Sequence, residues 1–364
     1  MSRIRFAALL PLLLAPLTPS SAAAQAPPGR PDSVAARVAF VGDVLLAASV
    51  GDAIDRHDVH WPWQGTRGMW DDADLVVANL EMAITTDGEE EDKQFNFRAA
   101  PSVLEGLQSA GVDLVTLANN HSLDYGASGL LDTVEALRAI GIPFVGAGPD
   151  DETAYAPHIV EIGGARIGFL GLSRVYPYAH WVATGRRPGV ASGYDYALER
   201  VLRVVDAVRP SVDALVVLVH WGSELADHPR EIDLAFTDAL LEHDVTAVIG
   251  HHPHVLQGMS WHDDAFVAWS LGNFVFGSFR ETTRQTGVLV LDFADDGRVI
   301  EAAFRPMQID AVRPMPPSAD QRQAILRRMR TLSRFFGTVV TPAGVVTTPE
   351  RILAQVPLPA RLFP

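Results

Sequence analysis

The chain has 364 residues, of which 48% are hydrophobic and 20% are charged, a composition typical of a globular protein with a substantial core. Its formal net charge of -15 at pH 7 argues against non-specific nucleic-acid binding, which normally requires a basic surface. The sequence contains no cysteine, which excludes disulfides, a cysteine nucleophile, thiolate metal ligands and lipid attachment at cysteine.

The N-terminus has the pattern of an export signal. Two arginines precede the apolar run of residues 6–17, which is too short to span a bilayer as a helix. Residues 22–24 are all alanine and fit an A-x-A cleavage motif. We therefore predict a signal peptide over residues 1–24 and a linker over residues 25–36, so that the mature protein is periplasmic or extracellular. An uncleaved anchor or an apolar first strand is the alternative.

The first half of the remaining chain alternates apolar runs with one long helical segment. Compact apolar runs bounded by turn residues predict buried strands at 37–41, 74–78, 112–118 and 142–146. Apolar residues at helical spacing, stopped by Gly141 and Pro143, predict a helix over residues 126–140.

The second half continues the alternation and adds hairpins. In chain order, we predict a hairpin of 159–162 with 166–170, a helix over 194–208, a strand over 214–219, a helix over 232–243, strands over 245–249 and 265–271, a hairpin of 287–293 with 299–304, and a helix over 319–336. This spacing predicts an α/β fold that is partly parallel, with antiparallel hairpins added. We expect one domain over residues 37–310 and a C-terminal extension over residues 311–364 that packs on it.

Polar residues follow six of the apolar runs at the point where each run ends. They are Asp43, Glu81, Asn120 with His121, His220 with Glu224, the histidines of residues 251–254, and Asn273. In open α/β sheets, ligand sites lie outside the carboxyl ends of the strands. Six strand ends that supply Asp, Glu, Asn and His therefore predict one convergent site.

The strongest single signal is Gly-His-His-Pro-His at residues 250–254. Three imidazoles within four positions after an apolar strand are typical of metal ligands on a loop, and zinc, manganese and iron are the candidate ions. Histidines that are solvated or cap a helix are the alternative. His220 and Glu224 add an imidazole and a carboxylate, although His220 alone is also consistent with a satisfied core histidine.

The Asn119-Asn120-His121 sequence places two amides and an imidazole directly after a buried strand. Asp124, three residues later, would orient His121 or cap the following helix. A separate segment, residues 176–194, carries two arginines and several aromatic residues. It is interpreted either as a lid that contacts an anionic ligand or as an ordinary surface loop.

Taken in order, six motifs resemble those of the CapA family of capsule-synthesis proteins. They are VGD at 41–43, ANLE at 78–81, LANNHSLDYG at 117–126, HWGSE at 220–224, GHHPHV at 250–255 and SLGNFVF at 270–276. The resemblance covers residues 37–310. It implies a metallophosphatase-like four-layer fold, with two β-sheets between helices, and a role in making, exporting or anchoring poly-γ-glutamate or a related envelope polymer.

The resemblance also implies a site for one or two divalent metal ions. The residues that match the metallophosphatase ligand pattern are Asp43, Glu81, Asn120, His220, His252 and His254. The pattern is short of one ligand, because Leu45 stands where its D-x-H motif has histidine. His121, steered by Asp124, matches the general acid, and Glu224 would position water or a substrate amine. Candidate contacts to substrate are Asn79, Asn119, His251 and Asn273.

Three functions remain open from the sequence. The first is a metal-dependent hydrolase or transferase that acts on an envelope polymer, and the second is an exported metal-dependent phosphoesterase. The third is a non-catalytic polymer-binding subunit with a degenerate metal site, which Leu45 favours over the second. The expected partners are an anionic envelope polymer or a small phosphoester or amide substrate, together with membrane-bound capsule-synthesis subunits, but no nucleic acid.

Overall fold

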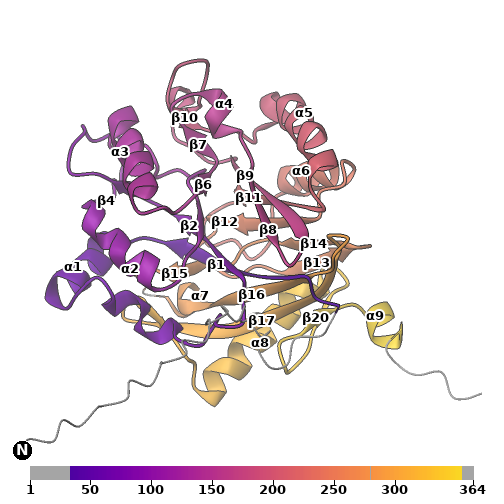
Figure 1. Ribbon diagram of the computed structural model, residues 1–364. Coiled ribbons are helices and arrows are strands. Elements are labelled where there is room, and N and C mark those ends of the chain that lie inside the picture. Colours follow the sequence, from indigo (N-terminus) through magenta and orange to yellow (C-terminus); the bar gives the residue numbers. More distant parts are fainter. Residues whose placement is uncertain (1–32, 279, 355–364) are drawn as a thin grey trace, which may run out of the picture. The chain divides into compact units, whose positions relative to one another are not determined.

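Two stacked β-sheets form the centre of the protein, and helices cover their outer faces (Figure 1). The computed structural model describes residues 33–278 and 280–354, which belong to one unit of the chain. The predicted signal peptide, residues 1–24, and most of the predicted linker, residues 25–36, lie outside the described residues.

The first sheet has eight strands in the order β18-β17-β16-β1-β2-β5-β6, with β15 paired to β1 beside this path. They are β1 Ala36–Val44, β2 Leu75–Leu80, β5 Leu114–Thr116, β6 Phe144–Val145, β15 Asn273–Val275, β16 Gln285–Phe293, β17 Val299–Asp310 and β18 Arg313–Met315. Strands β1, β2, β5 and β6 run parallel, whereas β16 pairs antiparallel with β1, β17 with β16, and β18 with β17. The sheet is therefore mixed, as the sequence predicts.

The second sheet has six strands in the order β13-β14-β12-β11-β9-β8. They are β8 His158–Ile162, β9 Ala165–Ser173, β11 Ala214–His220, β12 Ala247–His251, β13 Met259–His262 and β14 Ala265–Ala268. Every residue of β11 and β12 is buried, which explains their unbroken apolar runs, because a central parallel strand is covered on both faces.

Three apolar clusters define four layers, helix on sheet on sheet on helix. One cluster joins the outer face of the first sheet to helices α1 Ala48–Arg56, α2 Leu104–Ser109 and α3 Gly126–Ala139. The middle cluster lies between the sheets, where Phe40 of β1 contacts Phe169 of β9. The third joins the outer face of the second sheet to α5 Leu198–Val208 and α6 Glu231–Leu241. The four-layer α/β/β/α architecture predicted from the sequence is confirmed.

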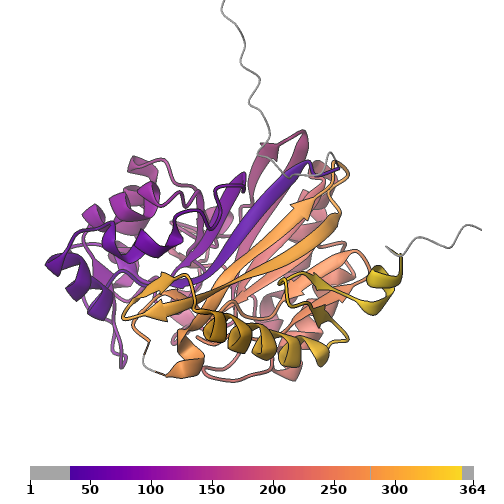
Figure 2. The same cartoon turned by 90° about the horizontal axis from the view of Figure 1, so that it is seen from below.

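The C-terminal segment closes one side of the sandwich. Helix α8 Ala319–Arg334 begins with a capping box, in which Ser318 and Gln321 each hydrogen-bond the other's backbone N–H. It lies along the lower face of the molecule in Figure 2, and its Ile325 and Met329 enter the cluster between the sheets. The remaining elements are short: α4 Asp151–Ala154, α7 Glu281–Arg284, α9 Pro349–Ala354, β3 Ala83–Ile84 with β4 Arg98–Ala99, β7 Ala147–Gly148 with β10 Gly189–Val190, and β19 Val339–Val340 with β20 Val346–Thr347.

Most predicted elements are present, but several ends differ. The strand predicted at 37–41 continues through Val44, and the strands predicted at 214–219 and 245–249 end on His220 and His251. The strand predicted at 112–118 is shorter, and the segment from Leu117 onward is already loop. Within the described residues, no helix is long and apolar enough to cross a membrane.

Candidate metal centre

The polar strand ends of the two sheets meet at one place. In the first sheet, Asp43 of β1 is in register with Asn79 of β2 on one side and with Asn273 of β15 on the other. In the second sheet, His220 at the end of β11 pairs with His251 at the end of β12. Because these strands share one direction within their sheets, their carboxyl ends deliver the polar side chains to one site, as the sequence predicts.

Two glycines allow the backbones to approach closely just before the ligand positions. A Cβ atom on Gly42 would lie 1.9 Å from the carbonyl oxygen of Gly272, and one on Gly250 would lie 2.1 Å from that of Trp269. The neighbouring N–H of Asp43 donates to the Gly272 carbonyl oxygen at 2.9 Å. Glycine is therefore required at both positions for packing of backbone on backbone.

The structure brings together all six residues that the sequence proposes as metal ligands. Atoms of Glu81, His252 and His254 lie within 4.8 Å of one another, and so do atoms of Asp43, Glu81 and His220. The sixth residue, Asn120, joins the second group, because His220 Nε2 lies 2.8 Å from its Oδ1. Glu81 belongs to both groups, which is the position expected of a ligand shared by two ions.

Glu81 is a buried carboxylate that lacks a complete set of partners. Its side chain is 1% exposed, and its Oε1 atom has no hydrogen-bond partner. This oxygen faces His220 Nε2 at 3.5 Å and His254 Nε2 at 3.9 Å. Burial, and then the nearby charge of Asp43, raise the pKa of Glu81 well above its ordinary value. A cation at this place would offset both effects.

Two of the histidines are held in the neutral form that binds metals. Burial, followed by the proximity of His252, lowers the pKa of His220 well below its ordinary value. Burial, followed by the proximity of His254, lowers the pKa of His252 to about 3. Both imidazoles therefore retain a lone pair at neutral pH, as a metal ligand must.

His254 has its tautomer fixed by its neighbours. Its Nδ1 lies 3.1 Å from Asp43 Oδ2 and 2.9 Å from Asn273 Oδ1, both acceptors, so that this nitrogen carries the proton. Its Nε2 is left facing Glu81. Burial alone would lower the pKa of His254, but the hydrogen bond and charge of Asp43 outweigh it and raise the pKa. Histidine ligands commonly have their second nitrogen held in this way by a carboxylate or carbonyl group.

The loop that carries His252 and His254 has an uncommon backbone. The φ angles of these residues are 97° and 58°, in the left-handed region that side chains other than glycine rarely adopt, and Pro253 separates them. Such conformations cost of order 1–3 kcal/mol each and persist only where surrounding contacts enforce them. The loop therefore holds two imidazoles toward the carboxylates at the expense of backbone strain.

A second group of side chains lies beside the ligands. His121 Nδ1 lies 2.7 Å from Asp124 Oδ2, so that the predicted pairing of these two residues is present. Asp124 is fully buried and His121 nearly so. Burial is the main cause that lowers the pKa of His121, against the opposing hydrogen bond from Asp124. Lys93, which the sequence reasoning did not single out, also contacts Asp124.

The four residues proposed to contact substrate have structural partners instead of open surface. Asn79 Nδ2 donates to Asp43 Oδ1 at 2.8 Å, and Asn119 Nδ2 donates to Asn79 Oδ1 at 3.0 Å. Asn273 orients His254, and His251 Nε2 donates to the carbonyl oxygen of Val41. All four are buried. They lie behind the ligand atoms, where they fix ligand orientation, and their contact with substrate stays a prediction.

Two further predicted positions differ in their surroundings. Glu224 is exposed on the loop after β11, near enough to His254 for its charge to raise that pKa. Leu45 is 3% exposed and belongs to the apolar cluster between the first sheet and its helices. The leucine that replaces the D-x-H histidine is thus part of the core.

The donor set fits a divalent cation. Two carboxylates, one amide oxygen and three imidazoles suit zinc, manganese or iron. The unpartnered Glu81 oxygen offers a negatively charged ligand atom for such an ion. His252 Nδ1 is also buried and without a hydrogen-bond partner. The residues present therefore fit the divalent metal implied by the sequence.

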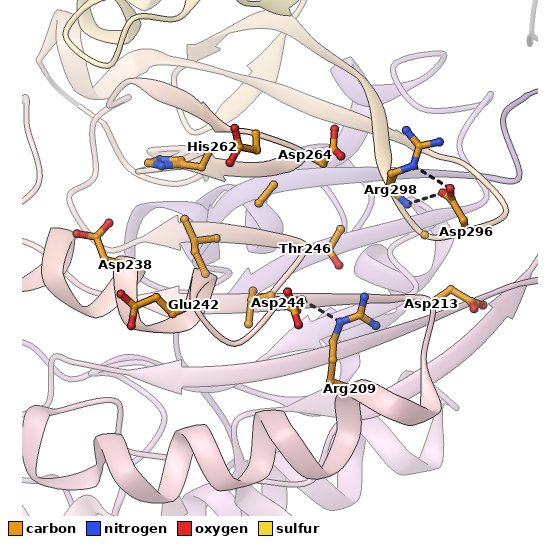
Figure 3. A pocket seen from close by; sticks show the side chains of 15 residues that line it. Arg209, Asp213, Asp238, Glu242, Asp244, Thr246, His262, Asp264, Asp296 and Arg298 are labelled. Carbon is orange, nitrogen blue, oxygen red and sulfur yellow. Dashed lines mark hydrogen bonds and ion pairs between the residues drawn. The ribbon is translucent and has the colours of Figure 1, made fainter.

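A separate hollow of about 590 Å³ lies at the opposite ends of β11 and β12, next to Asp213 and Thr246 (Figure 3). Its charged side chains are partly paired, since Arg298 Nε donates to Asp296 at 2.8 Å and Arg209 Nε donates to the carbonyl oxygen of Asp244. None of the residues of the metal centre lines this hollow. The candidate site is therefore the buried cluster and not this surface depression.

The four-layer sandwich and the buried carboxylate–histidine cluster at its strand ends define an α/β protein with a candidate metal centre. Residues 37–278 match the family model described as bacterial capsule synthesis protein PGA_cap. The chain belongs to this CapA-type family, which confirms the resemblance seen in its motifs.

Individual relatives agree with this membership. The chain is 27% identical over 296 residues to the capsule biosynthesis protein CapA of Bacillus anthracis, covering 80% of this chain and 72% of that protein. It is 30% identical over 336 residues to a probable polyglutamine synthesis accessory protein of Mycobacterium tuberculosis, covering 87% of both.

A solved structure of a putative 5'-nucleotidase from Staphylococcus aureus, in complex with alpha-ketoglutarate, shares 14% identity with this chain. The match covers 80% of this chain and 58% of that one, with a TM-score of 0.45, so the chain spans less than two thirds of that protein. A likeness this distant says nothing about activity.

Proposed function

We propose that this protein is an exported, metal-dependent hydrolase or transferase that acts on a poly-γ-glutamate-like envelope polymer or its precursor. The single observation that carries the metal-dependent part is the buried Glu81 carboxylate, whose unpartnered oxygen faces both His220 and His254. The family supplies the biological setting, because its named relatives are capsule and polyglutamine synthesis proteins. Export is supported by the signal-peptide pattern of residues 1–24, and it places the protein in the periplasm or outside the cell.

The chemistry follows from the residues around the cluster. A divalent cation held by Asp43, Glu81 and the histidines would lower the pKa of water and polarise a phosphoryl or acyl oxygen. His121 donates its Nδ1 proton to Asp124, which leaves Nε2 to give or accept a proton at the reacting group. Glu224 is exposed beside the cluster, where a carboxylate can hold a water molecule or a substrate amine.

Leu45 supports a second candidate function, a polymer-binding subunit that keeps the fold without catalysis. The position that supplies a metal ligand in the metallophosphatase pattern is here a buried part of an apolar cluster. One metal position is consequently short of a protein ligand. A site that binds metal without turnover would distinguish this function from the first.

Metal content of the purified mature protein tests the proposal. We expect near-stoichiometric zinc, manganese or iron in the wild type and its loss in His252→Ala/His254→Ala. The control is His243→Ala/His262→Ala, which removes two imidazoles outside the cluster. Absence of bound metal in the wild type, even after each ion is added, would contradict the metal centre.

Turnover then separates the two candidates. With metal bound, hydrolysis of γ-glutamyl amides and phosphoesters is measured for the wild type and for His121→Ala. We expect turnover in the wild type and a loss of about 100-fold or more in the variant, which still binds metal. Metal binding without turnover on either substrate class would favour the polymer-binding subunit.

A further inference from the structure

The chain contains a single lysine, and it lies next to the candidate metal centre. Among 29 lysine and arginine residues, only Lys93 is lysine. It belongs to the segment that joins β3 to β4, where acidic residues precede it, and its side chain is 13% exposed. A nearly buried ammonium requires partners, because desolvation of a charged group is costly.

The polar contacts of the Lys93 ammonium are with the loop that carries Asn120 and His121. Its Nζ donates to Asp124 Oδ1 at 2.5 Å and to the backbone carbonyl oxygen of Asn120 at 2.6 Å. The same nitrogen lies 3.2 Å from His121 Nδ1. One ammonium thus contacts a proposed ligand residue, the proposed proton donor and the carboxylate that pairs with that donor.

The contacts of Asp124 show what this arrangement fixes. Lys93 occupies Oδ1, whereas His121 Nδ1 and the backbone N–H of Phe97 each lie 2.7 Å from Oδ2. The carboxylate is fully buried, and each oxygen has a partner of its own. The ammonium at Oδ1 and the Phe97 N–H at Oδ2 together oppose rotation of the carboxylate, so that Oδ2 stays aimed at the imidazole.

Lys93 also connects this loop to residues 176–194. Its Nζ lies 4.9 Å from the centre of the Trp181 ring. Beside it, the hydroxyl of Tyr178 donates to the carbonyl oxygen of Asp92, and His180 Nε2 lies 3.4 Å from a carboxylate oxygen of Glu91. The segment interpreted as a lid or a surface loop is therefore attached to the edge of the site through three successive residues.

We propose that Lys93 is a positioning residue of the metal centre, which fixes His121 through Asp124 and fixes Asn120 through its backbone carbonyl group. An arginine would not substitute, because its planar fork does not offer the compact point charge that reaches both acceptors. This inference rests on the proposed function for its role in metal binding. The orientation of His121 in the metal-free protein tests it independently.

The experiment compares the wild type with Lys93→Met, which keeps the length of the side chain without its charge. Arg98→Met, five residues further along at the start of β4, is the control for loss of one positive charge at an exposed position. Two quantities are measured: the affinity and visible spectrum of bound Co²⁺, and the ¹⁵N signals of the His121 imidazole without metal. We expect Lys93→Met to weaken Co²⁺ binding by about 10-fold or more and to alter its spectrum, as outer-sphere partners of ligands do. We also expect a second set of His121 signals.

Chemical rescue separates positioning from general damage to the fold. Because the chain has no cysteine, Lys93→Cys introduces the only thiol, and 2-bromoethylamine alkylates it in the unfolded protein. The thiolate displaces bromide and forms a thioether that carries an ammonium at nearly the length of lysine. Refolded aminoethylated protein should recover Co²⁺ affinity and the single set of His121 signals.

Unchanged Co²⁺ binding and unchanged His121 signals in Lys93→Met would overturn the inference, and so would failure of aminoethylation to restore either one. If the wild type binds no Co²⁺, the proposed metal-dependent function fails, whereas the His121 signals still decide whether Lys93 positions the imidazole. If Lys93→Met does not fold, the comparison of Lys93→Cys before and after alkylation decides the matter.

Discussion

Replacing Glu81 with glutamine should stabilise the metal-free protein while abolishing its response to metal. The buried Oε1 of Glu81 has no hydrogen-bond partner, and the pKa of the group is raised, so its charge destabilises the metal-free fold. A glutamine keeps an oxygen that accepts from Asn79, which donates to Glu81 Oε2 at 3.3 Å. Removal of an unsatisfied buried charge contributes about 1–3 kcal/mol. We expect a gain of that order in the free energy of unfolding at pH 8.

The gain should depend on pH in one direction. The folded pKa of the Glu81 carboxyl group is raised above its unfolded value of 4.5. Below pH 4.5 the group does not destabilise the folded protein, because it is protonated in both the folded and the unfolded state. The cost grows as the pH rises from 4.5 toward the folded pKa, and it is complete above the folded pKa. The difference between Glu81→Gln and wild type should therefore vanish in acid and grow toward alkaline pH. Urea unfolding in the presence of a chelator measures it at each pH.

Metal should reverse the order of stability. An ion that binds only the folded state at 100 times its dissociation constant adds about 2.7 kcal/mol to the wild type. Glu81→Gln should gain far less, because it lacks the ligand that the two groups share. Glu89→Gln, an exposed change of equal charge, is the control. A destabilised metal-free Glu81→Gln at every pH, or full stabilisation of the variant by metal, would refute the reasoning.

Two further predictions concern the packing around the site. Leu45→His should lower the free energy of unfolding by about 2–3 kcal/mol without raising metal stoichiometry, because the side chain is buried in an apolar cluster and not among the ligands; a second equivalent of bound metal would contradict this. Gly42→Ala should destabilise by at least about 1–3 kcal/mol, since its Cβ would collide with the Gly272 carbonyl oxygen. Gly51→Ala, in helix α1 with its nearest contact at 3.6 Å, should be neutral or stabilising by up to about 1 kcal/mol, and equal effects of the two changes would refute the packing argument.

The candidate site was largely predictable because its residues stand at the ends of apolar runs. The β11 run and the His220 that ends it are adjacent in sequence, so the pattern of burial reveals both at once. The same holds for β12 and the histidines that follow it. Lys93 gave a weaker signal in the sequence, because it stands out only as the single lysine of the chain. Its position beside the candidate site depends on a contact between its loop and Asp124, about 30 residues further along the chain.

The sequence by itself determined the α/β class, the order of the strands along the chain and the identity of the polar residues at their ends, because these depend on local periodicity and composition. Tertiary structure decided which strands are neighbours, for example that β15 and β16 both pair with β1. It also decided that His254 keeps its Nδ1 proton for Asp43 and Asn273, and that Leu45 turns into the core. These features arise from contacts between residues far apart in the chain. The free energies of such contacts cannot be inferred from the local sequence pattern.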